Sequence, residues 1–141
     1  MTVEAYEEDY LLIEAKPISK PDSTPPKAEE RIAIRDRIGD FAKHSRGMIG
    51  HWQNKLAEYY AEKKRVVVWG TDSSAITFMA TVPDARQIEF VVDEDPRKMN
   101  LHIPNGQRIV APDFLQMYQP DAVIVINPLD YIHIQSMLTK L

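Results

Sequence analysis

The sequence contains no cysteine among its 141 residues, which excludes a disulfide framework and any metal site built on thiolates. No apolar run approaches the roughly 20 residues that a membrane-spanning helix needs. The first ten residues, MTVEAYEEDY, are acidic where a secretory signal peptide carries basic residues. These absences predict a cytoplasmic protein that does not enter a membrane.

Glycine is also scarce, with five residues in all and only Gly70 and Gly106 after residue 50. The dinucleotide-binding fingerprint G-x-G-x-x-G and the P-loop both need several glycines in one short turn. Asp72 stands where the second glycine of the fingerprint would be, and its carboxylate would repel a pyrophosphate. The sequence therefore argues against standard NAD, FAD or ATP binding.

The net charge of −4 is divided into three blocks along the chain. Residues 1–26 hold two bases and six acids, residues 27–65 ten bases and six acids, and residues 66–141 five bases and nine acids. A nucleic-acid-binding surface would concentrate lysine and arginine with interleaved aromatic residues. No block has that pattern, and we predict no nucleic-acid partner.

The chain is predicted to have four parts. Residues 1–16 hold a terminal strand at Tyr10–Ala15, which needs a sheet to pair with and suggests the end of a preceding domain. Residues 17–28 read as a semi-rigid linker because they contain four prolines. Residues 29–65 form an amphipathic helical segment, and residues 66–141 form an α/β domain.

The helical segment carries one stripe of mostly apolar residues at alternating three- and four-residue steps. Gly39, Gly47 and Gly50 each cost about 1 kcal/mol relative to alanine, which leaves open a kink or break between Gly47 and Gly50. Two roles are open for the stripe: packing on the following domain, or binding a partner such as a second copy. The stripe consists of Ile34, Ile38, Phe41, Ser45, Met48, Trp52 and Tyr59, widened by Ile49 and Leu56.

The last part alternates strands with helices, which predicts a small Rossmann-like parallel sheet with right-handed connections. Residues 66–69 are continuously apolar, as expected of a parallel strand buried on both faces. Further strands are expected at 88–93 and 122–126, with a short one at 108–110. Helices are expected at 73–81, 112–118 and 129–141.

Ligands of such a sheet bind beyond the carboxyl ends of its strands. Asp93 stands where a dinucleotide-binding fold places its ribose-binding acid, although it could equally cap its own loop. A helix starting near Ser73 would point its amides at an anion. No catalytic constellation and no metal-ligand spacing stands out, and His102 and His133 are isolated. The candidate binding residues are Gly70, Thr71, Asp72, Ser73, Asp93, Lys98 and Asn127.

Three stretches, VVVWGTDSSAIT, VVDEDPRKMNLHIPNGQRIVAP and PDAVIVINPLDYI, resemble the C-terminal domain of the sugar C-methyltransferase family. The resemblance covers about residues 29–141, and its most specific part is the segment from Asp93 to Lys98 with Pro104. The segment YLLIEAKP resembles the final strand of the methyltransferase domain that precedes this module in the family. The matching residues are Trp69, Gly70, Thr77, Asp93, Pro96, Lys98, Pro104, Pro120, Asp121 and Asn127.

The resemblance implies a substrate-side or scaffolding domain that is not catalytic alone. Its partner would be a methyltransferase catalytic domain or chain that binds S-adenosylmethionine, which this chain itself would not bind. The ligand would be a nucleotide-sugar or a related substrate. Two alternatives are a stand-alone module for a nucleotide or nucleotide-sugar, and an oligomerisation module that forms a homodimer through helix 34–59.

Overall fold

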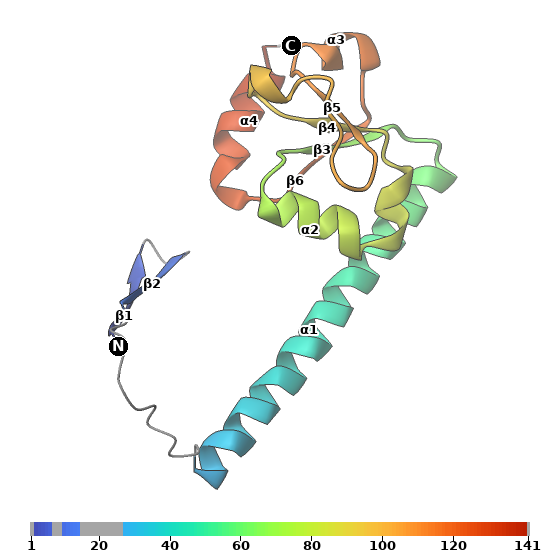
Figure 1. Cartoon of the computed structure of the whole chain (residues 1–141). Coiled ribbons are helices and arrows are strands. Elements are labelled where there is room, and N and C mark those ends of the chain that lie inside the picture. Colours follow the sequence, from blue (N-terminus) through green and yellow to red (C-terminus); the bar gives the residue numbers. More distant parts are fainter. Residues whose placement is uncertain (1, 7–9, 15–26, 141) are drawn as a thin grey trace. The chain divides into compact units, whose positions relative to one another are not determined.

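The computed structural model describes residues 2–6, 10–14 and 27–140, with side chains for 27–140 (Figure 1). The chain divides into two units, residues 1–38 and 39–141, and each is described by itself. Within the described residues, no helix combines the length and the apolar character needed to cross a membrane. The predicted linker lies mostly outside the described residues.

The first unit contains an antiparallel pair of strands, β1 (Thr2–Tyr6) and β2 (Tyr10–Glu14), in which Thr2 lies opposite Glu14. The strand predicted at 10–15 is therefore confirmed. The expectation that it stands alone in this chain is wrong, because β1 supplies its partner. The sequence of β1 alternates polar Thr2 and Glu4 with apolar Val3 and Ala5, a two-residue period typical of a strand.

The predicted helical segment is one continuous helix, α1 (Ala28–Ala61), which begins in the first unit and continues into the second. It has no break between Gly47 and Gly50. A Cβ atom added at Gly39, Gly47 or Gly50 would meet no atom within 4 Å. These glycines therefore lie on an open side of the helix and lower its stability without changing its course.

We expect Gly47→Ala to stabilise the chain by up to about 1 kcal/mol, because alanine restricts the unfolded backbone and meets no neighbour in the helix. Circular dichroism at 222 nm during urea unfolding measures the effect. Gly106→Ala is the matched control, since Gly106 has a φ of +95° and alanine there is strained. A lower helical content or midpoint for Gly47→Ala would contradict the expectation.

The second unit is built on a four-stranded parallel sheet with the order β5-β4-β3-β6, which confirms the predicted fold class. The strands are β3 (Val66–Trp69), β4 (Phe90–Val92), β5 (Arg108–Val110) and β6 (Ala122–Val125). The strand order reverses between β3 and β6. In open α/β sheets such a switch point leaves a crevice at the carboxyl ends of the strands.

Helices cover both faces of this sheet. Val66 and Val68 of β3 face one core with Leu56 of α1 and residues of α2 (Ser73–Thr81). Val67 and Trp69 face a second core with residues of α3 (Phe114–Tyr118) and α4 (Tyr131–Leu138). Burial on both faces explains why the strand is apolar at every position. Short 3₁₀ helices are η1 (Pro83–Gln87), η2 (Pro96–Lys98) and η3 (Pro128–Asp130).

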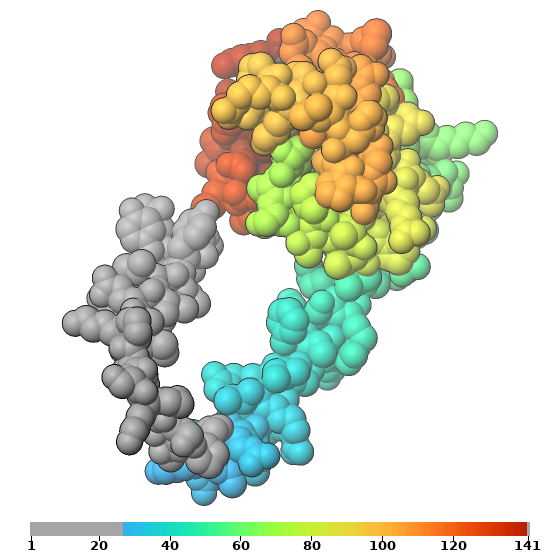
Figure 2. Space-filling model, in the orientation of Figure 1, coloured from blue at the N-terminus to red at the C-terminus, as the bar shows by residue number. Residues whose placement is uncertain are grey.

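The turn before β5 is fixed against α2. In Figure 2 this orange segment lies against the green residues of α2, and the Asn105 side chain donates a hydrogen bond of 2.6 Å to the Met79 carbonyl. The elements observed between residues 66 and 125 begin and end within about two residues of those predicted. Larger differences occur in α1, which ends at Ala61 where residue 65 was predicted, and at the C-terminus. There the predicted helix 129–141 is divided between η3 and α4, because Pro128 initiates a tighter turn first.

Candidate functional site

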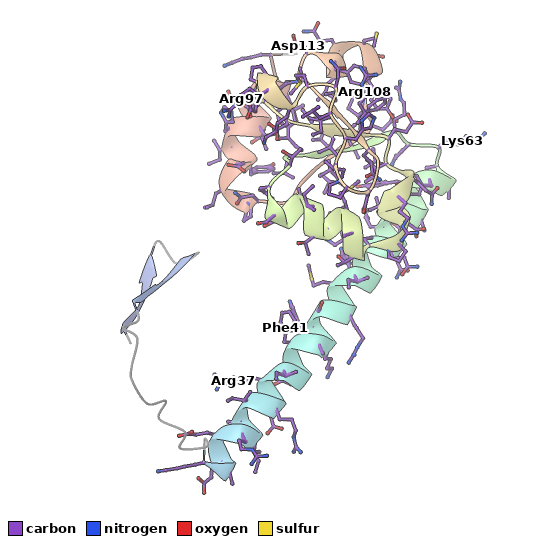
Figure 3. All side chains as sticks on the ribbon, in the orientation of Figure 1. Arg37, Phe41, Lys63, Arg97, Arg108 and Asp113 are labelled. Carbon is purple, nitrogen blue, oxygen red and sulfur yellow. The ribbon has the colours of Figure 1, made fainter. Side chains whose placement is uncertain are left out.

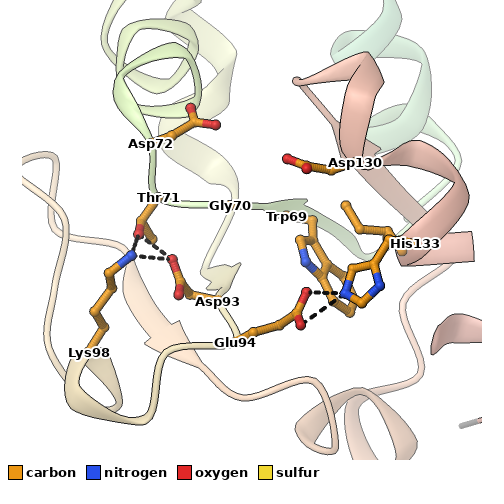
Figure 4. Close-up of a pocket in the computed structure, with 10 residues that line it drawn as sticks. Trp69, Gly70, Thr71, Asp72, Asp93, Glu94, Lys98, Asp130 and His133 are labelled. Carbon is orange, nitrogen blue, oxygen red and sulfur yellow. Dashed lines mark hydrogen bonds and ion pairs between the residues drawn. The ribbon is translucent and has the colours of Figure 1, made fainter.

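A cleft of about 270 Å³ lies beyond the carboxyl ends of β3 and β4, next to the start of α4 (Figure 4). Residues 69–72, which end β3 and lead into α2, form one side. Asp93, Glu94 and Lys98, which follow β4, form another. The remaining side comes from Asp130, His133 and Ile134. This is the edge at which the sequence predicted a ligand site.

Gly70 makes the turn from β3 into the cleft. Its φ of +102° lies in the left-handed region, where a side chain would be strained. Its amide donates a hydrogen bond of 2.7 Å to the Val92 carbonyl of β4. The turn therefore stays within bonding distance of the neighbouring strand and places Thr71 beside the end of β4.

Thr71, Asp93 and Lys98 form one connected cluster in the cleft. The Lys98 ammonium donates to the Thr71 Oγ1 at 2.8 Å and to the Asp93 Oδ2 at 2.9 Å. The Thr71 hydroxyl donates in turn to the same carboxylate oxygen. The other oxygen, Asp93 Oδ1, accepts the backbone amide of Asp95 at 2.9 Å. Asp93 therefore orders its own loop, which is one of its two predicted roles, and it also lines the cleft.

The environment of Asp93 keeps its carboxyl ionised. Its side chain is only 10% exposed, and this burial taken alone raises the pKa. The hydrogen bonds from Thr71, Lys98 and the Asp95 amide outweigh burial, so the pKa of Asp93 lies below its ordinary value. The cluster thus holds a buried negative charge next to one partly exposed positive charge.

Hydrogen bonds from Arg97 to the Asp95 carboxylate order the loop after β4. The Asp95 carboxylate accepts the Arg97 backbone amide at 3.0 Å and binds the Arg97 guanidinium at 2.8 Å, and these bonds lower the pKa of Asp95 to about 2. The short helix η2 that follows presents Lys98 to the cleft. The Arg97 side chain is 89% exposed and does not line the cleft.

Asp72 is the N-cap of α2, and its Oδ1 accepts the Ala75 amide at 2.8 Å. This carboxylate occupies the place where the sequence predicted an anion on the helix amides. An N-cap acid satisfies one amide and repels a second anion, so this geometry disfavours an anion at the helix start. Ser73 begins the same helix, and it does not line the cleft.

His133 and Glu94 face each other across the cleft, which the sequence did not predict. The His133 Nε2 lies 3.0 and 3.1 Å from the two Glu94 carboxylate oxygens, and Figure 4 shows the pair in front of Trp69. The two residues are 39 positions apart, so only the fold brings them together. The sequence held a partial indication of this side of the cleft, since Asp130 and His133 are three residues apart and therefore lie on one side of a helix start. It held no indication that Glu94 would join them.

Five of the seven predicted binding residues line the cleft, and Ser73 and Asn127 do not. Asn127 instead caps η3, where its side chain accepts the Leu129 amide at 3.0 Å. The cleft is lined by one lysine, Lys98, and by four carboxylates, those of Asp72, Asp93, Glu94 and Asp130. Among residues 27–140, no three acidic or histidine side chains are grouped to hold a metal ion.

The cleft is therefore suited to hydroxyl groups. A carboxylate accepts hydrogen bonds and donates none, so carboxylate oxygens that remain free in the cleft can accept hydrogen bonds from hydroxyl groups. The single ammonium of Lys98 is already held by Asp93, and little positive charge remains for a phosphate.

A family model described as the C-methyltransferase C-terminal domain matches residues 26–136 of this chain. The match confirms the resemblance seen in the sequence over about residues 29–141. Comparisons with curated proteins and with solved structures found no match.

Proposed function

The chain belongs to the C-methyltransferase C-terminal domain family, and from this we propose that it is the substrate-side domain of an S-adenosylmethionine-dependent C-methyltransferase. The observation that carries the proposal is the polar cleft at the carboxyl ends of β3 and β4 in a domain of that family. The domain would hold the substrate there and leave methyl transfer to a catalytic domain or chain.

The residues of the cleft do not fit the methyl donor. A donor site of this kind needs a glycine-rich turn that lets backbone amides approach the ligand, and the turn after β3 has one glycine, Gly70, followed by the capping carboxylate of Asp72. Both oxygens of Asp93 are already engaged. We therefore assign S-adenosylmethionine to the catalytic partner.

The proposed ligand is a nucleotide-sugar or a related substrate, bound through its sugar or ribose hydroxyls. Asp130 has no side-chain bond at the helix start that it caps, and its carboxylate lines the cleft as an available acceptor. Glu94 supplies a further acceptor on the opposite side, where its carboxylate also meets His133. The diphosphate is expected to lie outside the ring of carboxylates, because like charges at this range repel.

The test is an amide-shift titration of the full chain with a thymidine or uridine diphosphate sugar. We expect shifts at residues 70–72, 93–98 and 130–134. Asp130→Ala should weaken binding by about 1.5–3 kcal/mol, the range for a hydrogen bond to a charged group. Asp113→Ala is the control, because Asp113 is exposed, lies outside the cleft and makes no side-chain cap bond.

Two results would contradict this assignment. Shifts confined to helix 34–59, or no shifts at millimolar ligand, would remove the cleft as the binding site. If Asp130→Ala and Asp113→Ala weakened ligand binding equally, the net charge of the chain would determine the affinity and a direct contact of Asp130 would not. Tight binding by the chain alone would instead favour the stand-alone nucleotide-sugar module.

A further inference from the structure

The first half of α1 exposes an apolar stripe. The side chains of Ile34, Ile38, Phe41 and Met48 are 46%, 61%, 72% and 48% exposed, although each is large and apolar. With Ser45 they follow steps of four, three, four and three residues. Figure 3 shows Phe41 projecting from the helix one turn after Arg37.

In the second half of the same helix the apolar stripe packs into the core of the α/β unit. Leu56 is fully buried in the core, and Trp52, Tyr59 and Tyr60 pack against that core. The Trp52 ring meets the Phe78 ring of α2 edge-on, with centroids 5.2 Å apart. The stripe predicted to run from Ile34 to Tyr59 is therefore divided, and only residues 34–48 remain exposed.

The exposed half has the width of a helix-pairing seam. A helix that packs on a sheet or a core presents an apolar face more than about 100° wide, whereas a strict four-three repeat forms a narrow seam that fits one other helix. Arg35 and Arg37 border the seam on its two sides. The widening begins at Ile49, where the helix approaches its own core.

We propose that a second copy of this chain covers the seam, as an antiparallel pair of α1 helices related by a twofold axis. In this register Phe41 of each copy packs on Ile38 of the other, and Ile34 packs beside Ser45. The overlap runs from residue 31 to residue 48, a length of about 27 Å at 1.5 Å per residue. This interface is separate from the cleft and does not depend on the proposed function.

The antiparallel direction follows from where the seam ends. After Met48 the same face of α1 is occupied by α2 and the sheet of its own chain. In a parallel pair the two α/β units would meet at the same end, on the face that the helices share. In the antiparallel pair they lie at opposite ends, and the twofold axis makes the two contacts identical.

Polar side chains that flank the seam can pair in this register. Glu30 of one copy lies beside His51 of the other, at flanking positions that face each other in antiparallel pairs, and both residues are exposed in the single chain. The acids Asp36 and Asp40 lie away from the seam. Arg37 of one copy lies beside His44 of the other at the equivalent flanking positions.

Sedimentation velocity of the full chain tests the pairing. We expect a dimer at about 100 µM, within the range of weak specific interfaces. Phe41→Glu should raise the dissociation constant at least about tenfold, because each dimer buries two Phe41 side chains. Gly47→Glu adds the same charge on the opposite side of the same half-helix and should leave the dimer intact. A monomer at millimolar concentration, or equal effects of both variants, would overturn the proposal.

Cross-linking tests the direction, and the absence of native cysteine makes introduced thiols unique. In the antiparallel pair residue 31 of one copy lies opposite residue 48 of the other. A mixture of Arg31→Cys and Met48→Cys should therefore form the mixed disulfide under mild oxidation, and neither variant alone should cross-link. Cross-linking of each variant with itself would show a parallel pair and overturn the antiparallel register.

Discussion

Asp93→Ala is expected to lower the free energy of unfolding by about 2–3 kcal/mol at pH 7. The variant leaves three donors without their shared acceptor: the Thr71 hydroxyl, the Lys98 ammonium and the Asp95 amide. Hydrogen bonds to a charged group contribute about 1.5–3 kcal/mol, and an unsatisfied donor adds a desolvation cost. The loss stays below that of a fully buried ion pair, because Lys98 is 40% exposed and water can solvate it.

The stability lost in Asp93→Ala is also expected to depend on pH. The pKa of Asp93 in the folded chain lies below the ordinary value of 3.8, so the folded state binds its proton less readily than the unfolded state does. The stabilisation is therefore fully present above pH 4 and is lost as the pH falls through the folded pKa. The gap in stability between the wild type and Asp93→Ala should narrow in that range.

Urea unfolding at pH 7 and at steps below pH 4 measures both effects. Asp113→Ala removes one exposed carboxylate with no side-chain cap bond, and it should change stability by less than about 0.5 kcal/mol. A gap that stays constant with pH would contradict the assignment of the loss to the ionised Asp93. A loss no larger than that of Asp113→Ala would show that the cluster is dispensable.

The sheet was predictable because its signal is local. Residues 66–69 are apolar at every position, and only a strand covered on both faces requires that. The position of Asp93 at the end of its strand was equally visible, since a carboxylate directly after an apolar run marks the edge of the sheet. Lys98 was a candidate as a basic residue of the loop after that strand, the family resemblance included it as well, and the fold places its ammonium on Asp93.

The rest of the cleft depends on tertiary structure. His133 was treated as isolated because its partner Glu94 is 39 positions away, and the sequence does not say which strand lies beside α4. Asp72 was assigned to a ligand, while the helix amide of Ala75 takes its carboxylate. The same local bonding explains Asn127, which caps η3. Short polar side chains at strand ends satisfy backbone groups first.

The sequence of α1 likewise predicts the helix but does not predict which half of its apolar stripe is buried. Its periodic stripe predicted the helix well, but the stripe continues on both sides of Met48 and does not say which part is buried. Only the structure distinguishes Leu56, which is fully buried, from Phe41, which is exposed. The attachment of α1 to the sheet therefore depends on a few residues of its second half.

Leu56→Ala is accordingly expected to destabilise the chain by about 3 kcal/mol. The side chain is fully buried in the core that also contains Val66 and Val68 of β3 and Phe78 of α2. Replacing a buried leucine by alanine loses the transfer free energy of the removed atoms and leaves a cavity, with a usual cost of 2–5 kcal/mol. Trp52 lies one turn earlier against Phe78, so tryptophan fluorescence, to which Trp69 of the second core also contributes, should report the loosened contact before global unfolding.

Leu129→Ala is the matched control, because it removes the same atoms from a side chain that is 73% exposed and should change stability by less than about 0.5 kcal/mol. Urea unfolding followed at 222 nm and by tryptophan emission separates two outcomes. If α1 is held to the sheet by this core, both signals shift to lower urea in Leu56→Ala. A Leu56→Ala midpoint equal to that of Leu129→Ala would show that α1 contributes little to the stability of the α/β unit.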